Sequence, residues 1–307
     1  MILLISENPI EAMSLLLYEE LKDKTNVQLI PHTEIPFNKN ISLFCKNGKL
    51  LGKIGDIELK DISAVYTRFD KINIEKNVSE ITKQQINLER LNWMNTLFEN
   101  IDAMVINKSS AQYSNSSKLF QSWIIKQYGF KIPNSLITTS EESVKNFIAN
   151  NKQVIYKSAS SERSIVKTFQ KEDFGKLHLL KNCPHLFQEQ IKGTDIRVHT
   201  LATGETFACE IKTQKSDYRY DKERDIKIID IPQSVKDKCV KLTLDLGLYL
   251  SGIDLRRSDN GDYYCFEVNP SPAFSWYEEQ TGLPITNAVA NMMLNANKYK
   301  KLAIRKY

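Results

Sequence analysis

The chain has 307 residues, is 41% hydrophobic and carries a net charge of +5 at pH 7, which allows one large or two to three small globular units. The charge is mild and spread along the sequence, which excludes a dedicated nucleic-acid binder and suits acidic partners such as nucleotides or a Glu/Asp-rich peptide. No apolar run approaches the roughly 20 residues that cross a bilayer, and the start of the chain lacks the features of a signal peptide, so neither membrane insertion nor export is expected.

The first third of the chain alternates short apolar runs with helical patterns, which predicts a small α/β unit. Strands are expected at 2–5, at 27–30, within 41–60, at 62–66 and at 103–106, and helices at 9–24 and 80–99. Arg68 follows the tip of one of these strands. A surface ion pair with Asp70 or another neighbour would account for it.

Two lysines in the middle of the chain stand where a phosphate group would be bound. Lys118 lies in the first turn of a helix that stops at Gly129, and the helix dipole disfavours a cation there unless an anion is near. Lys157 ends a strand at 151–157 and precedes a serine-containing loop. From that place a lysine can reach phosphates while the amides and hydroxyls of the loop close over them.

The next segments alternate strands with polar turns. Strands are expected at 186–191, 195–201 and 206–212, followed by helices at 234–246 and 283–302. Backbone groups of the first strand suit the edge of an adenine ring and the Asp195 carboxylate suits ribose hydroxyls, although an ordinary edge strand and turn would look the same. Asp217 and Arg219 share one face if their segment is extended; a solvated charged loop is the alternative.

The five cysteines are odd in number and scattered, with no Cys-x-x-Cys pair. They are expected to be reduced thiols in a cytoplasmic protein. The four histidines lack the spacing of a helical zinc site, and each is expected to be structural.

A hairpin near the C-terminus is the strongest local pattern. Apolar segments at 252–255 and 263–268 flank Asp259, Asn260 and Gly261, residues that tolerate the positive φ of a tight turn. Because strand side chains alternate, the second strand is expected to place Tyr264, Phe266 and Val268 on one face and Cys265, Glu267 and Asn269 on the other.

Hard oxygen donors converge on one side of this hairpin. Asp254, on the first strand, can point to the same place as Glu267 and Asn269, with Arg256 beside it. Two carboxylates and an amide carbonyl predict a magnesium site that keeps open positions for phosphate oxygens. A surface hairpin that simply faces water is the alternative, but the Asn-Pro-Ser-Pro run at 269–272 turns the chain out of the sheet here and favours the metal site.

Two sequence runs of this region resemble a known family. G-I-D-L followed by F-E-V-N-P-S-P resembles the metal-binding end of the ATP-grasp ligases, and S-W-Y-E-E-Q-T-G-L-P-I, at 275–285, resembles the microviridin-type graspetide synthetases of the RimK-like branch. The resemblance covers nearly the whole chain in element order and is specific from about residue 188 onward. It implies an α/β (α+β) ATP-grasp fold with an N-terminal domain at 1–106 and two subdomains, at 107–187 and 188–307, that clamp ATP.

The resemblance also implies roles for individual residues. ATP and Mg²⁺ are the expected cofactors, and the nucleotide is assigned to Lys118, Lys157, Gln188, Glu189, Ile191 and Asp195. The metal is assigned to Asp254, Glu267 and Asn269, the substrate to Arg68, Asp217 and Arg219, and catalysis to Asp217, Arg219 and Arg256. Enzymes of this kind usually have glycines in the loop after Lys157, and this chain has serines there. Either serine hydroxyls contact the phosphates or the loop is a lid.

The resembling enzymes cross-link ribosomally made peptides through side-chain esters and amides. Joining a carboxylate to a hydroxyl or amine is uphill in water, so ATP first converts the acid to an acyl phosphate, and the enzyme supplies positioning and charge neutralisation. The expected partner is a precursor peptide with a leader and an acidic core, and a homodimer is a further expectation. One alternative is a RimK-like ligase that adds a free amino acid to a small acid or a protein tail. Another, a regulatory protein without catalysis, is disfavoured by the intact set of metal and phosphate residues.

Overall fold

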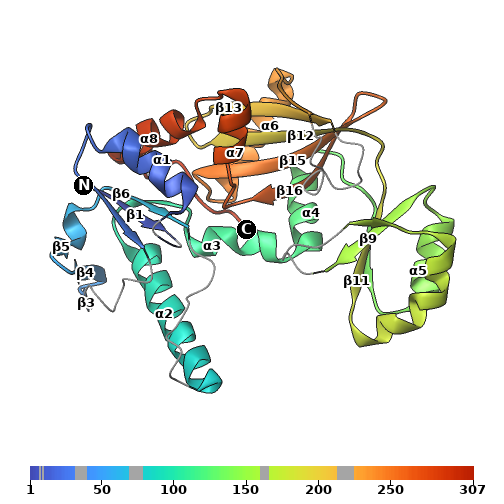
Figure 1. Cartoon of the computed structure of the whole chain (residues 1–307), viewed down its shortest axis with the longest axis horizontal. Coiled ribbons are helices and arrows are strands. Elements are labelled where there is room, and N and C mark those ends of the chain that lie inside the picture. Colours follow the sequence, from blue (N-terminus) through green and yellow to red (C-terminus); the bar gives the residue numbers. More distant parts are fainter. Residues whose placement is uncertain (7, 9, 32–39, 69–78, 160–165, 213–224) are drawn as a thin grey trace.

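The computed structural model describes residues 1–307 except 7, 9, 32–39, 69–78, 160–165 and 213–224. In the described part of the chain the strands form four sheets. The central unit follows the N-terminal unit in the sequence, but in space the C-terminal sheet lies between these two units (Figure 1). No helix in this part is long and apolar enough to cross a membrane.

The N-terminal unit is built on a parallel sheet in the order β2-β1-β6-β7. Its elements are β1 (Ile2–Ser6), α1 (Ala12–Leu21), β2 (Val27–Pro31), β6 (Ala64–Thr67), α2 (Glu80–Asn100) and β7 (Met104–Ile106). A parallel sheet is covered on both faces, and accordingly every residue of β1 is buried. Helix α2 buries only four residues, all in its second half, and its first half extends away from the sheet (Figure 1).

A small antiparallel sheet flanks this unit. It consists of β3 (Ile41–Lys46), β4 (Lys49–Ile54) and β5 (Ile57–Glu58), followed by the short helix η2 (Leu59–Asp61). Asn47 and Gly48 connect β3 to β4 with positive φ angles of 51° and 72°. That backbone conformation suits a two-residue hairpin turn, which explains the Asn-Gly pair.

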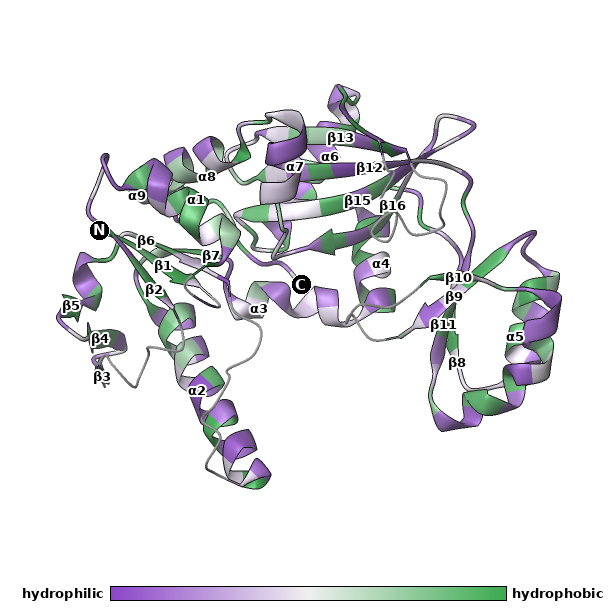
Figure 2. Ribbon diagram, in the orientation of Figure 1, coloured by the Kyte–Doolittle hydropathy of each residue, from purple (hydrophilic) through white to green (hydrophobic). Residues whose placement is uncertain are grey.

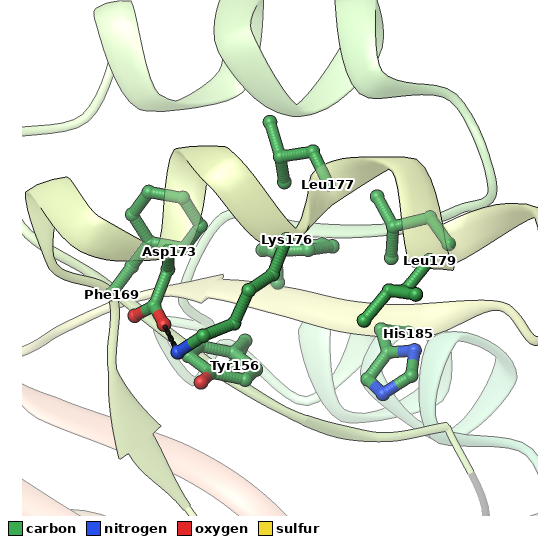
Figure 3. Close-up of a pocket in the computed structure, with 9 residues that line it drawn as sticks. Tyr156, Phe169, Asp173, Lys176, Leu177, Leu179 and His185 are labelled. Carbon is green, nitrogen blue, oxygen red and sulfur yellow. Dashed lines mark hydrogen bonds and ion pairs between the residues drawn. The ribbon is translucent and has the colours of Figure 1, made fainter.

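The central unit is an antiparallel sheet in the order β10-β9-β11-β8, with helices on one side. Its elements are β8 (Ser135–Thr138), α5 (Glu141–Ala149), β9 (Val154–Ser158), β10 (Lys167–Thr168), η4 (Lys171–Asn182) and β11 (His185–Glu189). A cavity of about 210 Å³ lies between η4 and this sheet, lined mainly by aromatic and leucine side chains (Figure 3). Tyr156 of β9 lines that cavity, so the next residue, Lys157, points to the opposite face of the sheet.

The C-terminal unit is an antiparallel sheet in the order β14-β13-β12-β15-β16. Its strands are β12 (Gly193–Leu201), β13 (Thr206–Lys212), β14 (Asp225–Ile228), β15 (Leu250–Ser258) and β16 (Tyr263–Asn269). Its helices are α6 (Gln233–Asp245), α7 (Ser275–Thr281), α8 (Ile285–Leu294) and α9 (Ala296–Tyr299). The chain passes from β7 to β8 of the central unit through three helices, α3 (Ser109–Gln112), η3 (Tyr113–Ser116) and α4 (Lys118–Gln127), and α4 packs on the C-terminal sheet.

Two apolar clusters cover the two faces of this sheet. One contains residues of α4 and α6, and the other contains residues of α7 and α8 together with residues of β1, β6 and α1. The second cluster therefore joins the N-terminal unit to the C-terminal sheet. Hydrophobic residues run along the strands of both units and alternate with hydrophilic residues on the helices (Figure 2).

The predicted elements are largely confirmed, with one exception near the end of the chain. The closing helix expected at 283–302 was wrong, because α8 ends at Leu294 and α9 begins at Ala296. Asn295, at φ −102° and ψ 27°, lies outside the helical region and separates them. The division at 106 and 187 stays a prediction; β11 crosses the second boundary, and α4 packs on the C-terminal sheet.

Candidate active site

The hairpin of β15 and β16 brings the predicted oxygen donors to one face of the C-terminal sheet. In its antiparallel register Asp254 lies opposite Glu267, and Gly252 lies opposite Asn269. The side chains of Asp254 and Glu267 are 32% and 26% exposed. Both carboxylates are therefore held by the strands and still open to a ligand, as strand periodicity predicts.

A β-bulge changes which side chains of β16 point to the same face of the sheet. Asp254 pairs with Glu267 but the next residue, Leu255, pairs with Cys265, so Phe266 is an extra residue in the strand. Cys265 is consequently buried in the apolar cluster with Leu255 and Val268. The prediction that Cys265 shares a face with Glu267 and Asn269, and Phe266 with Val268, was wrong for this reason. Burial raises the pKa of the Cys265 thiol well above its usual value.

Two cations contact the two carboxylates. Lys118 Nζ lies 3.0 Å from Glu267 Oε1, and Arg197 Nη1 donates to Asp254 Oδ1 at 2.7 Å. The side chains of Lys118 and Arg197 are only 11% and 6% exposed. Charges this far removed from water are stable only when paired, so each cation depends on a carboxylate of the hairpin.

The donor set fits a magnesium ion. Asp254, Glu267 and Asn269 offer hard oxygens, and the Asn269 Oδ1 atom is oriented by accepting a hydrogen bond from the Ser271 backbone N–H at 2.8 Å. Within the described ranges no three His, Cys, Asp or Glu side chains group closely enough to hold a metal by themselves. A metal here would therefore also need the Asn269 amide, water or phosphate oxygens, which is how magnesium is usually held beside a nucleotide.

Arg197 is a site residue that the sequence analysis did not single out. Its guanidinium lies over the ring of Tyr277 at 5.8 Å. It also fills the space above Gly252, where an added Cβ would come within 2.0 Å of Arg197 Nη2. The glycine is thus required for the close approach of this arginine to the hairpin. The available signal was the Asp-x-Arg spacing of Asp195 and Arg197, the same spacing noted at Asp217 and Arg219.

Arg256 and Asp195 are paired with each other. Arg256 Nε and Nη2 lie 2.7 and 2.6 Å from Asp195 Oδ1, and Arg256 Nη1 donates to the Ile191 carbonyl at 2.8 Å. The guanidinium also lies over the ring of Phe266, the bulge residue. Arg256 therefore fixes the segment after β11 to the hairpin. The assignments of Asp195 to ribose and of Arg256 to catalysis stay predictions.

Arg68 reaches the turn that follows β16. Its Nη1 atom donates to the Ser271 carbonyl at 3.1 Å, and its Nε lies 3.2 Å from Glu11 Oε1. Glu11 caps α1 by accepting from the backbone N–H groups of Met13 and Ser14. The ion pair of Arg68 is therefore with a buried carboxylate rather than on the surface, and the assignment of Arg68 to the substrate stays a prediction.

The expected adenine-binding segment is well anchored. The buried Gln188 side chain donates from Nε2 to Ser135 Oγ at 2.9 Å, and the Glu189 Oε2 atom accepts from the Asn134 backbone N–H at 3.2 Å. Both side chains are thus held by the segment at 134–135. Contacts to adenine would therefore be made by backbone groups of Gln188 and Glu189. Lys157 lies on β9, which pairs with β11, and is opposite Leu186 in that pairing.

Asp217 and Arg219 lie outside the described residues, as do most of the serines after Lys157. Their assignment to the substrate and to catalysis stays a prediction. The described site therefore consists of the hairpin donors, Lys118, Arg197, and the pair formed by Arg256 and Asp195.

Comparison with known proteins identifies the family. Residues 115–293, more than half of the chain, match the RimK-like ATP-grasp domain. The chain belongs to the RimK-like ATP-grasp family. The predicted resemblance to this branch is thereby confirmed.

Solved ATP-grasp structures share the whole architecture of this RimK-like chain. Macrocyclase MdnC bound with precursor peptide MdnA, from Microcystis aeruginosa MRC, superimposes with a TM-score of 0.83 at 22% identity, over 96% of this chain and 100% of that chain. The ATP-grasp ligase PsnB, complexed with minimal precursor, Mg and ADP, gives a TM-score of 0.83 at 22% identity, over 96% and 98% of the two chains. The predicted ATP-grasp fold is confirmed.

Sequence comparison finds a different kind of relative. A "Probable alpha-L-glutamate ligase" of Enterobacter sp. (strain 638) is 30% identical over 99 residues, which is 32% of this chain. The match spans 33% of that relative's own length.

Replacing Lys118 with Met should weaken ATP binding by about 10- to 100-fold, the effect of losing a charged hydrogen bond. Calorimetric titration of the protein with ATP and Mg²⁺ measures this. Lys126→Met, at the exposed last turn of the same helix, is the matched control and should bind like the wild type. If Lys157→Met weakens binding and Lys118→Met does not, the assignment of Lys118 to phosphate is wrong.

Proposed function

We propose that the chain is an ATP-dependent ligase that activates Glu and Asp side chains of a ribosomally made precursor peptide and joins them to hydroxyl or amine side chains of the same peptide. The observation that carries this proposal is the meeting of Asp254, Glu267 and Asn269 with Lys118 and Arg197 on one sheet face. Paired carboxylates and cations of this kind suit a metal–phosphate ligand.

The solved relatives support a peptide as the substrate. MdnC and PsnB were both solved with precursor peptides, and PsnB with Mg and ADP. ATP, Mg²⁺ and a precursor with a leader and an acidic core are therefore the proposed ligands of this chain. All five cysteines are free thiols, which supports a reducing compartment, and we place the enzyme in the cytoplasm.

We propose a separate role in binding for each group of residues at the site. Asp254, Glu267 and Asn269 would hold magnesium, which when bound neutralises phosphate charge. Lys118 and Lys157 would bind nucleotide phosphates as point charges. Arg197 would hold the Asp254 carboxylate in place through their ion pair. The peptide substrate would contact Arg68, Asp217 and Arg219.

A second candidate function is the addition of a free amino acid to an acid or a protein tail. It is favoured by the sequence similarity to a probable alpha-L-glutamate ligase. Both functions use the same activation of a carboxylate by ATP and differ in the nucleophile. The mass of the product separates them.

Incubation with ATP, Mg²⁺ and the precursor peptide should give a product lighter by one water for each linkage, because an intramolecular condensation expels water and adds nothing. ADP should form in proportion, without any free amino acid. Mass spectrometry of the peptide and an assay of ADP make the measurement. The matched control is the same peptide with its core Glu and Asp replaced by Gln and Asn, which should stay unchanged in mass.

A gain in mass equal to an amino acid residue would favour the second candidate. A peptide that is shown to bind, yet never changes mass while ATP stays intact, would refute the ligase proposal. Binding of the peptide is therefore measured first, by titration calorimetry.

A further inference from the structure

Gln121 of α4 forms two hydrogen bonds with the backbone of a single residue of β16. Its Nε2 atom donates to the Val268 carbonyl at 3.0 Å, and its Oε1 atom accepts from the Val268 N–H at 3.0 Å. Strand β16 is at the edge of the sheet, so these two backbone groups face away from β15. The Gln121 amide therefore takes the place that the peptide group of another strand would occupy.

The contact between Gln121 and Val268 lies next to the proposed metal site. Val268 stands between Glu267 and Asn269, two of the three proposed oxygen donors. Lys118 lies one turn before Gln121 on the same helix face and contacts Glu267 at 3.0 Å. Helix α4 is thus attached to this short segment of β16 at three points, two from Gln121 and one from Lys118.

The environment makes the amide hard to replace. Gln121 is 2% exposed, and Val268 is 1% exposed. A buried backbone N–H or C=O without a partner is costly, and water has little access here. An amide is the side chain that offers one donor and one acceptor in a plane, which matches the N–H and C=O of an edge strand.

We infer that Gln121 is a positioning residue that fixes the distance between Lys118 and the donors Glu267 and Asn269, and so sets the affinity of the site for a magnesium–nucleotide complex. This inference rests on the proposed function of the site. Gln121 acts through its neighbours, since its side chain is occupied by Val268.

The test is Gln121→Met, which keeps the length of the side chain and removes the two hydrogen bonds to Val268 together with a longer one, of 3.4 Å, to Ser114 Oγ. We expect the variant to bind Mg²⁺ with ADP about tenfold more weakly by calorimetry and to need about tenfold more Mg²⁺ for half-maximal ADP release. If this variant does not fold, Gln121→Glu carries the same test, because it keeps the acceptor for the Val268 N–H and loses the donor.

Two controls separate positioning from a general loss of stability. Gln127→Met, an exposed position near the end of α4 that bonds only to the Trp123 carbonyl within the described structure, should match the wild type. Met94→Ala removes buried volume from a cluster of the N-terminal unit and should lower the melting temperature without changing the affinity for Mg²⁺ and ADP.

The inference is overturned if Gln121→Met binds Mg²⁺ and ADP like the wild type, or if Met94→Ala weakens that binding equally. A wild type that binds Mg²⁺ and ADP but forms no cross-linked peptide would refute the proposed function alone, and the binding comparison would still decide the role of Gln121. A wild type that binds no magnesium–nucleotide complex would overturn both.

Discussion

Asp254→Asn and Glu267→Gln should each reduce ADP release by about 100-fold or more while the protein stays folded. Each substitution removes one negative charge and leaves the size of the side chain almost unchanged, so the packing of the hairpin is kept. Each variant should be less stable than the wild type, because it leaves a buried cation, Arg197 or Lys118, without its charged partner, but the amide oxygen can still accept the hydrogen bond, so the protein should remain folded. The loss should therefore appear in turnover, because the charge is needed at the metal and phosphates.

The measurement is ADP release at saturating ATP over a series of Mg²⁺ concentrations, with thermal unfolding of each variant followed by circular dichroism. Asp262→Asn is the matched control, because Asp262 belongs to the same hairpin and its ion pair with Lys131 is exposed. It should leave turnover unchanged. Wild-type turnover in both Asp254→Asn and Glu267→Gln would show that magnesium is held elsewhere.

The hairpin shows how far local sequence rules reach. Alternating side chains and the Asp-Asn-Gly turn are properties of neighbouring residues, and they were sufficient to predict the hairpin and to bring Asp254 and Glu267 to one side of it. The direct opposition of Asp254 and Glu267 depends on the register shift at the bulge. The same rules placed Cys265 on the wrong face. The bulge at Phe266 inserts one residue, and nothing in the local pattern marks it, because an aromatic ring is acceptable on either face of a half-buried strand.

Those local rules could not predict contacts between segments that are far apart in the sequence. The helix-dipole argument predicted a phosphate near Lys118, which stays a prediction; the anion that the structure places there is the Glu267 carboxylate. Identifying that partner required knowing that α4 packs against β16. Arg197 was overlooked for the same reason: its position depends on Gly252 in another strand and on Tyr277 in α7. The fold could be predicted from the resemblance of the hairpin and the run after it to known ligases, whereas the ion pairs of the site depend on the packing of the elements.

Arg197→Lys should lower turnover by about 10- to 100-fold, although the charge is kept. The planar guanidinium of Arg197 donates to Asp254 while lying over the ring of Tyr277. Lysine offers a compact ammonium group on a flexible stem and cannot make both contacts in the same geometry. Arg197→Met should be more severe, because it leaves Asp254 without this partner. Breaking a buried pair costs about 3–5 kcal/mol, and because Asp254 is 32% exposed we expect about 2 kcal/mol of lost stability.

The comparison that makes this prediction decisive is Arg257→Lys. Arg257 is the neighbour of Arg256 on β15, points to the opposite face of the sheet, and pairs with Glu210 at 2.8 Å with 41% of its side chain exposed. Lysine keeps a cation beside Glu210, and Lys212 Nζ also lies 3.7 Å from this carboxylate, so Arg257→Lys should leave turnover unchanged and lower the melting temperature little. If Arg197→Lys also keeps wild-type turnover, a point charge beside Asp254 is sufficient, and the fit of Arg197 between Gly252 and Tyr277 serves packing alone. A loss confined to Arg197→Lys and Arg197→Met would instead show that the direction of the guanidinium, and with it the orientation of the Asp254 carboxylate, is what the reaction requires.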